Sequence, residues 1–263
     1  MGGEGAWRAL QLDREGDVLR VAIAHPTSAL NTVDGLLHGE LTRLFRELKR
    51  ESAARAVLLI GRGRAFSAGG DFRWFPTLDD LDKLEHLRRD AKQMIWDLLD
   101  VELPIVAALN GPAVGLGASI ALLCDVIFMA DTATIVDPHV RVGIVAGDGG
   151  TAIWPLVLGP ARAKQFLLTG DPVTAAEALA MGLVNAVVPH DQLDAEIDRW
   201  CAELLDKSPT ALAIVKRSMN ADTESIRGIS SLGFQAVSLY YGTDEAKEGV
   251  AAYKEKRPPR FRK

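Results

Sequence analysis

The amino-acid sequence predicts an α/β protein in which strands alternate with helices, followed by a region that contains helices alone. Short apolar runs alternate with longer amphipathic segments, glycine-rich turns follow two of these runs, and strand signals end near residue 190. The chain has 263 residues, enough for one large domain or two small ones. We therefore expect a core over residues 1–190 and a C-terminal helical region over residues 191–263.

Five apolar runs have the length expected of buried strands. They are residues 18–24, 56–60, 105–109, 126–129 and 184–188. Two longer segments, 34–50 and 78–100, have the apolar spacing of helices, and Pro104 prevents the second from continuing. Amphipathic helices are predicted from Pro189 to Lys254, with no further strand.

Composition excludes several classes of partner. The content of 48% hydrophobic and 25% charged residues is typical of a globular protein, and the net charge of -5 argues against nucleic acid as a partner. We predict no membrane contact, because no apolar run reaches the roughly 20 residues that span a bilayer. Cys124 and Cys201 are predicted to be packed thiols, with no cysteine or histidine at metal-ligand spacing. A reducing cytoplasm and the absence of a bound metal fit this pattern.

The stretch "GRGRAFSAGGDF", residues 61–72, follows a predicted strand and carries two glycines before Asp71. Glycine permits positive φ and lets a ligand approach the backbone, so that peptide N–H groups can point into a cleft. Taken alone, the pattern fits a phosphate loop, an anion-binding nest or a tight turn.

A second glycine turn, "LNGPAVGLGASIALLCD" at residues 109–125, follows another strand and opens a helix near Leu116. Unpaired N–H groups and the positive end of the helix dipole converge at a helix start. Neither turn has the spacing of a Walker loop or a dinucleotide fingerprint. One N–H donor from each turn can together form an oxyanion hole for a polarised carbonyl.

These motifs resemble the crotonase (enoyl-CoA hydratase/isomerase) superfamily. The resemblance covers nearly the whole chain, through "AFSAGGDF", "AALNGPAVGLGASIALLCDVIFMAD", "GDGGTAIWPLVLGPARAKQFLLTGDPVTAAEALAMGLVNAVVP" and "DEAKEGVAAYKEKRPPRF". It implies a spiral of ββα units with C-terminal helices that assembles as a homotrimer or a dimer of trimers. It also implies an enoyl-CoA hydratase or isomerase-like activity, a lyase, on an acyl-CoA thioester, with coenzyme A present only as part of the substrate.

By this resemblance, the backbone N–H groups of Gly70 and Leu116 hold the thioester carbonyl. The coenzyme and substrate contacts that the resemblance implies are Ser67, Ala68, Asp71, Arg73, Ser119 and Phe261. Phe261 lies in a basic tail that contains Lys254, Lys256, Arg257, Arg260, Arg262 and Lys263. Such a run also fits a solvated chain terminus.

The sequence departs from the hydratases at the two positions where they carry catalytic glutamates, which are here Ser119 and His139. Serine does not titrate near neutral pH, so hydration by a pair of carboxylates is not expected. The ordinary pKa of histidine, near 6.5, suits proton transfer. We predict that His139 and Asp148 are catalytic, because Asp148 falls where other superfamily members place a catalytic aspartate.

Two alternatives remain open. The pair of His139 and Asp148 also resembles the site of 6-oxocamphor hydrolase, a cofactor-free β-diketone hydrolase; there Asp148 would orient the imidazole and His139 would activate water. The second alternative is a family member that binds acyl-CoA without catalysis, since both glutamates are missing.

His38 lies on the first predicted helix, and it either approaches this cleft or lies on an exposed face.

Overall fold

The computed structural model describes residues 6–74, 81–221, 228, 233 and 243–261. Its main sheet has six strands in the order β1-β2-β3-β4-β6-β9. Their bounds are β1 Leu10–Glu15, β2 Val18–Ile23, β3 Ala56–Gly61, β4 Ile105–Leu109, β6 Val126–Ala130 and β9 Ala186–Val188. Strands β1 and β2 pair antiparallel, and the pairs from β2 to β9 are parallel. The predicted α/β class is confirmed.

A smaller sheet lies beyond the carboxyl end of β4 and has the order β5-β7-β8. Its strands are β5 Ala113–Val114, β7 Thr134–Val136 and β8 Val173–Thr174. The sequence analysis did not predict these strands or β1. Two or three residues are too short for an alternating pattern, so only pairing with distant segments defines them as strands.

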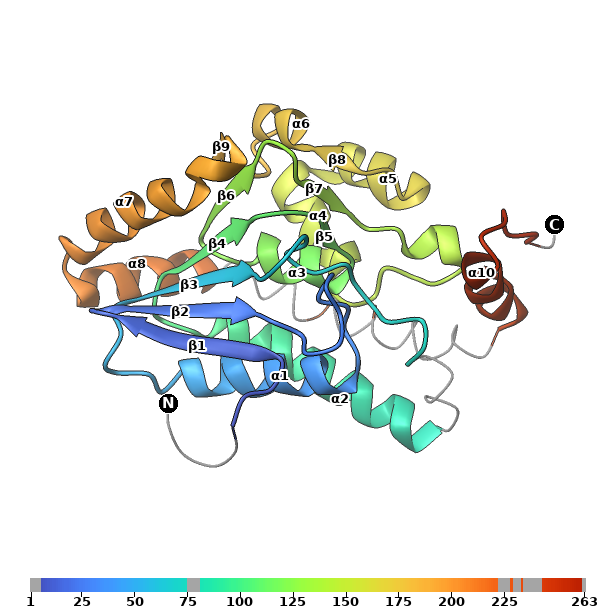
Figure 1. The fold of residues 1–263 in the computed structure, drawn as a ribbon, viewed down its shortest axis with the longest axis horizontal. Helices are drawn as coiled ribbons and strands as arrows, with labels where there is room; N and C mark the ends of the chain where they lie inside the picture. Colours follow the sequence, from blue (N-terminus) through green and yellow to red (C-terminus); the bar gives the residue numbers. More distant parts are fainter. Residues whose placement is uncertain (1–5, 75–80, 222–227, 229–232, 234–242, 262–263) are drawn as a thin grey trace.

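Helices connect the strands and cover the sheet (Figure 1). Those of the core are α1 Gly35–Leu48, α2 Leu81–Leu99, α3 Leu116–Leu122, α4 Gly150–Leu158, α5 Pro160–Thr169 and α6 Ala175–Ala180, with the 3₁₀ turns η2 His139–Val142 and η3 His190–Gln192. Helix α1 begins where predicted, because the Asp34 carboxylate accepts the N–H groups of Leu36 and Leu37. Helix α3 begins at Leu116, also as predicted; the predicted start of the second helix at residue 78 lies outside the described residues.

The last predicted strand is shorter than expected. Residues 184–188 were predicted, but β9 begins at Ala186. The cause is Asn185, whose side-chain oxygen accepts the N–H of Ile127 at 2.8 Å while its own N–H donates to the Ile127 carbonyl at 2.9 Å. The Asn185 side chain accepts the Ile127 N–H in place of a backbone carbonyl. Regular pairing with β6 therefore starts at the next residue, Ala186.

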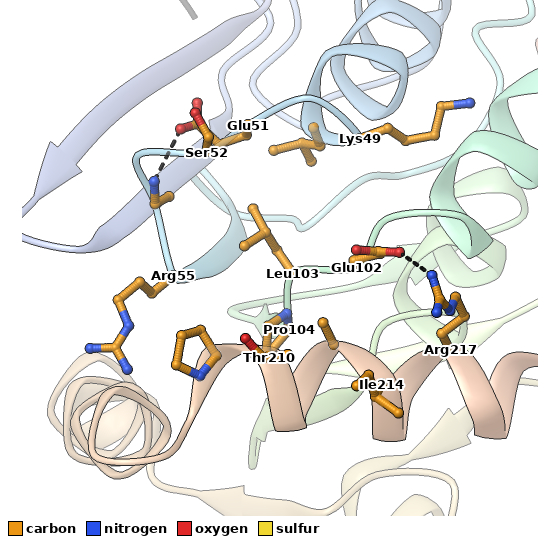
Figure 2. Close-up of a pocket in the computed structure, with 14 residues that line it drawn as sticks. Lys49, Glu51, Ser52, Arg55, Glu102, Leu103, Pro104, Thr210, Ile214 and Arg217 are labelled. Carbon is orange, nitrogen blue, oxygen red and sulfur yellow. Dashed lines mark hydrogen bonds and ion pairs between the residues drawn. The ribbon is translucent and has the colours of Figure 1, made fainter.

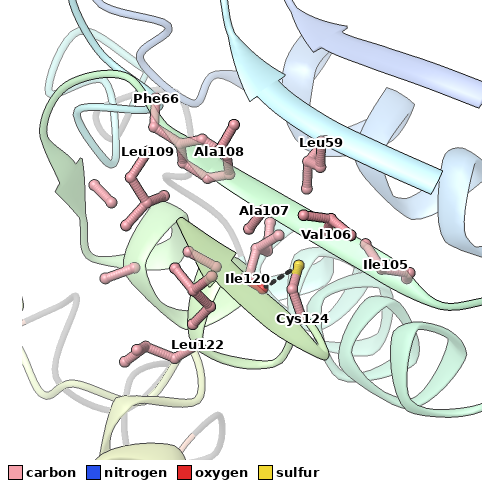
Figure 3. Packing of buried hydrophobic residues seen from close by; sticks show 14 of the residues in the cluster. Leu59, Phe66, Ile105, Val106, Ala107, Ala108, Leu109, Ile120, Leu122 and Cys124 are labelled. Atoms are coloured by element: carbon pink, nitrogen blue, oxygen red, sulfur yellow. Dashed lines mark hydrogen bonds between the residues drawn. The ribbon is translucent and has the colours of Figure 1, made fainter. Parts of the chain in front are cut away.

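The core lies between the main sheet and its helices. Figure 3 shows side chains of β4 packed against those of α3, with Leu59 and Phe66 beside them. Cys124 is buried in this cluster, and its thiol donates to the Ile120 carbonyl at 3.3 Å. Burial raises the pKa of the thiols of Cys124 and Cys201, and both cysteines are free. The prediction of two packed thiols is confirmed.

Helices α7 Leu193–Leu205, α8 Pro209–Asn220 and α10 Asp244–Lys254 follow the core. Helix α7 packs against β3, β4 and β6, whereas α10 packs against η2. In Figure 1, α10 lies at the opposite end of the molecule from α7 and α8. The boundary predicted at residue 190 and the role of these helices in assembly stay predictions. Every helix in the described ranges is too short or too polar to cross a membrane.

Candidate active site

Two glycine turns that follow β3 and β4 lie side by side. The Ser67 N–H donates to the Pro112 carbonyl at 3.2 Å, and the Val114 N–H donates to the Ser67 carbonyl at 2.8 Å. This parallel bridge continues the order of the sheet, because β3 and β4 are themselves parallel neighbours. The two turns that the sequence singled out are therefore joined at the carboxyl edge of the sheet.

Glycine is required where these turns touch. Gly69 has φ +77°, and a Cβ built on it would lie 3.1 Å from the Val114 carbonyl oxygen. A Cβ on Gly117 would lie 2.8 Å from the Cβ and 2.9 Å from the carbonyl oxygen of Ser67. Gly69 adopts a left-handed backbone conformation that glycine favours, and Gly117 leaves no room for a methyl group beside Ser67.

The amides of Gly70 and Leu116 make no hydrogen bond within the described part of the chain. Leu116 is the first residue of α3, so its N–H has no partner in the helix. The residues around Gly70 are fixed by Val33, whose N–H donates to the Gly69 carbonyl at 2.8 Å and whose carbonyl accepts the Asp71 N–H at 2.9 Å. Both amides are available to a ligand oxygen, as an oxyanion hole requires.

A third segment enters the site from the smaller sheet. Strand β7 pairs parallel with β5, and the Gly115 N–H donates to the Val136 carbonyl at 2.9 Å. The chain then turns through Asp137 and Pro138 into η2, whose first residue is His139. This turn places His139 beside Gly115, the residue that precedes Leu116.

His139 has a carboxylate at each ring nitrogen. Its Nδ1 lies 2.5 Å from Asp137 Oδ1, and its Nε2 lies 3.5 Å from Asp148 Oδ2. In the β-diketone hydrolase alternative Asp148 orients the imidazole, but the shorter contact is with Asp137, which the sequence analysis did not select. The signal in the sequence is the spacing of two residues between Asp137 and His139, which allows a local hydrogen bond to the ring.

The imidazole is close to the amide side of the site. A Cβ on Gly115 would lie 3.2 Å from His139 Cε1 and 3.7 Å from Asp148 Oδ2. Ser119 is fully buried one turn further along α3, and a Cβ on Gly149 would lie 3.4 Å from its Oγ. His139, Asp148 and Ser119 therefore surround the start of α3, where Leu116 presents its N–H.

The electrostatics favour a protonated histidine. Burial lowers the pKa of His139, but the carboxylates of Asp137 and Asp148 outweigh burial and raise this pKa to about 10. Burial raises the pKa of Asp148 to about 6; His139 opposes this effect and Asp137 adds to it. The two neighbouring carboxylates thus favour the protonated imidazole, and burial favours the neutral form of Asp148.

The same three residues form the one group in the described ranges whose side chains could hold a metal ion, with one ligand atom of each within 4.8 Å of the others. Asp137 already occupies His139 Nδ1 at hydrogen-bond distance. His139 Nδ1 and Asp137 Oδ1 are therefore engaged with each other. The donor set fits proton transfer better than metal binding.

The predicted coenzyme contacts have partners of their own. The Ser67 hydroxyl donates to the Asn31 carbonyl at 2.8 Å, and the Ala68 N–H donates to the Leu30 carbonyl at 2.9 Å. Arg73 is exposed and forms a two-pronged pair with Asp71, which lowers the pKa of that carboxyl. The Ser67 hydroxyl is thus engaged within its turn, whereas Arg73 is exposed beside the partly buried Asp71.

Phe261 and His38 lie at two other edges of the site region. The Phe261 ring lies 3.0 Å from the position of a Cβ on Gly143, at the end of η2, and is 38% exposed. His38 is buried on α1, with its ring centroid 6.0 Å from that of Trp74, and burial lowers its pKa to about 4. Its Nε2 has no hydrogen-bond partner among the described residues. His38 is therefore a neutral, buried imidazole beside the loop that follows Gly70.

A separate cavity of about 550 Å³ lies at the opposite edge of the main sheet (Figure 2). It is lined by Arg55 and Pro104, which directly precede β3 and β4, and by Thr210 and Ile214 of α8. Its rim carries an ion pair between Arg217 and Glu102 at 2.9 Å. No catalytic residue that the sequence predicted lines this cavity.

Comparison with known proteins identifies the family. A model of the enoyl-CoA hydratase/isomerase family matches residues 13–263. The chain therefore belongs to the enoyl-CoA hydratase/isomerase family, within the crotonase superfamily of enzymes, as the motifs predicted.

Three solved structures illustrate the range of similar proteins. An enoyl-CoA hydratase/isomerase from Mycobacterium paratuberculosis is 35% identical with a TM-score of 0.88, over 92% of this chain and 97% of that one. An enoyl-CoA hydratase from Mycobacterium avium subsp. paratuberculosis is 27% identical with a TM-score of 0.89, over 98% and 100%. A β-diketone hydrolase from the cyanobacterium Anabaena, bound to (S)-3-oxocyclohexyl acetic acid, is 26% identical with a TM-score of 0.84, over 89% and 94%. The crotonase fold is confirmed.

Proposed function

We propose that this protein catalyses a hydratase- or isomerase-like reaction on an acyl-CoA thioester. The amides of Gly70 and Leu116 bind the thioester oxygen and stabilise the enolate that forms when a proton leaves or reaches the neighbouring carbon. The observation that carries the proposal is the juxtaposition of the unpaired Leu116 amide with a charged imidazole one residue away, against Gly115.

The charges assign separate roles to the two titrating groups. His139 enters the reaction as an acid, because two carboxylates hold its proton. Asp148 enters as a base, because its raised pKa brings its proton affinity closer to that of a carbon acid polarised by the amides. Asp137 keeps the ring in place through Nδ1. One acid and one base on the same side suit the transfer of a proton between two carbons of the substrate.

Coenzyme binding and assembly belong to the same proposal. The coenzyme lies along Ser67 and Ala68, with Arg73 and the basic tail near its phosphates and Phe261 against it. Large apolar side chains are exposed on α5 and α8, among them Leu168 at 73% and Met219 at 71%. Contact with further copies, as a homotrimer or a dimer of trimers, would cover such side chains.

A second candidate is the hydrolysis of a carbon–carbon bond in a β-diketone. It is favoured by the imidazole between carboxylates and by the similarity to the β-diketone hydrolase from Anabaena. Water gives one proton to Asp148 and adds as hydroxide to one carbonyl; the bond between that carbon and the central carbon then breaks, and its electron pair converts the second carbonyl to an enolate. The amides would hold the enolate oxygen while His139 protonates its carbon, giving a carboxylic acid and a ketone. Asp148 afterwards returns its proton to His139, which lies 3.5 Å away.

Turnover of crotonyl-CoA and of a bicyclic β-diketone, followed by absorbance and product mass, distinguishes these candidates. The expected result is turnover of the thioester, with a loss of roughly 10²- to 10⁴-fold in His139→Ala, the range for a general acid or base. Gly39→Ala is the matched control, because Gly39 on α1 has no atom within 4 Å of its would-be Cβ.

Three other outcomes would contradict the leading proposal or part of it. Turnover of the diketone without coenzyme affinity by calorimetry would replace the leading proposal with the second. Coenzyme A binding without turnover of either compound would favour the non-catalytic family member. Unchanged activity in His139→Ala would remove His139 from the mechanism.

A further inference from the structure

Helix α10 lies against the turn that carries His139, and the contact point is a glycine. A Cβ on Gly249 would lie 2.1 Å from the carbonyl oxygen and 2.3 Å from the carbonyl carbon of Val142, the last residue of η2. Both atoms belong to backbone, so neither can rotate away. The helix backbone therefore touches the histidine turn directly.

Gly249 lies in the middle of α10, where glycine is a poor helix former. Alanine would favour the helix, so local propensity does not explain this residue. The close approach to Val142 does explain it, because any side chain would separate α10 from η2.

The same stripe of α10 extends in both directions from Gly249. One turn earlier, the Glu245 carbonyl oxygen lies 2.6 Å from the position of a Cβ on Gly143, which caps η2 with φ +66°. One turn later, the Tyr253 ring lies 4.3 Å, between centroids, from the ring of Phe72. Phe72 follows Gly70 by two residues, so one helix stripe contacts the segments that carry both halves of the site.

The chain after α10 adds a further contact to the histidine turn. Arg257 pairs with Glu248 through two bonds of 2.6 and 2.9 Å, and the Arg260 N–H donates to Glu248 at 2.6 Å. These bonds fold the tail back along α10 and bring Phe261 against Gly143. The turn is thus covered by the helix and by the tail that the helix holds.

We propose that Gly249 is a positioning residue for His139, and that the stripe formed by Glu245, Gly249 and Tyr253 sets the imidazole relative to the oxyanion amides. A longer side chain at residue 249 would push Val142 and its turn away from β5 and α3. His139 would then lose its alignment with Asp148, which is carried by the segment before α4. Only the catalytic role of His139 in this inference rests on the proposed function.

The charged groups around η2 determine how a displacement of this turn would change the pKa of His139. Asp137 and Asp148 face His139 directly. Arg141 on η2 is engaged by Asp171 and by the Thr169 carbonyl, and Glu248 on α10 is engaged by Arg257. Separation from Asp148 removes a carboxylate from the imidazolium, so the pKa of His139 should fall.

The test is Gly249→Ala in the full-length protein, with the imidazole of His139 titrated by NMR and assigned through His139→Gln. We expect the titration midpoint to fall by about one unit or more, the usual scale of environmental shifts. With a turned-over substrate, kcat should fall at least about tenfold with a smaller change in KM. Gly39→Ala, also a helical glycine to alanine change, should leave both quantities unchanged.

An unchanged His139 titration in folded Gly249→Ala would overturn the inference. Should that variant fail to fold, Phe261→Ala alters the same turn from its partly exposed side and should shift the midpoint in the same direction by less; no shift would again overturn it. The NMR measurement needs no substrate, so it remains valid even where the proposed reaction is wrong.

Discussion

Gly70 and Leu116 contribute backbone amides to the site, whereas Asp137, His139 and Asp148 contribute side chains. The amides are fixed by hydrogen bonds between adjacent turns of the main sheet, and glycines provide the clearance. The imidazole is fixed by two carboxylates and by packing of α10 on a single 3₁₀ turn. The amide half should therefore be sensitive to an added methyl group, and the proton-transfer half to changes in charge.

Apart from His139→Ala, the largest effect on kcat is expected from Gly117→Ala. The added methyl group would meet the Cβ and carbonyl oxygen of Ser67 and separate the two turns. Since one oxyanion donor is typically worth roughly 10²- to 10³-fold in kcat, we expect a loss of that size with His139 still titrating as in the unaltered protein. Activity equal to that of Gly39→Ala would show that the two amides do not act together.

A moderate effect is expected in the pH dependence of stability. The raised pKa of His139, about 10 against 6.5 ordinarily, means that its contribution to the free energy of unfolding is complete below about pH 6.5. The contribution is lost as pH rises through about 10, because the folded state then gives up the proton it had retained. Urea unfolding at several pH values between these limits should show the stability advantage over His139→Gln shrinking with rising pH.

Asp137→Asn tests which carboxylate is responsible. Loss of the carboxylate at Nδ1 should lower the pKa of His139 and move the decline in stability to lower pH. The same pH profile in Asp137→Asn and the unaltered protein would contradict the charged arrangement.

The smallest effect is expected from Ser119→Ala. The Ser119 hydroxyl is fully buried, and its oxygen has no hydrogen-bond partner among the described residues. Because an unsatisfied buried hydroxyl costs about 1 kcal/mol or more, the free energy of unfolding should rise slightly, and a contact with substrate would appear as a rise in KM of less than about tenfold. A fall in stability would mean that the hydroxyl is bonded in the folded protein.

Much of the fold could be read from local pattern. The apolar run at residues 105–109 predicted β4 with its observed bounds. The apolar spacing over residues 34–50 predicted α1, whose first turn the Asp34 carboxylate caps. Strands β5, β7 and β8 could not be found in this way, since pairs of two or three residues exist only through their distant partners.

In the candidate site, too, some residues could be predicted from the sequence, and others could be found only from contacts in the folded chain. The family resemblance selected Gly70, Leu116, His139 and Asp148, but not Asp137, whose role depends on the orientation of the imidazole ring beside it. The sequence left open whether His139 gives or takes a proton, whereas its raised pKa depends on the carboxylates of Asp137 and Asp148 beside it. A pKa depends on every charge within a few ångströms, and only the folded chain brings those charges together.

The sequence by itself determined the family, the α/β class and the positions of the two glycine turns, because these follow from short-range spacing and from backbone freedom at particular glycines. Only the tertiary structure decided which carboxylate holds the imidazole, that the Ser67 hydroxyl is engaged by Asn31, and that Gly249 lies on Val142. Each of these contacts depends on the distance between two groups and on their relative orientation. The spacing of residues along the chain determines neither quantity.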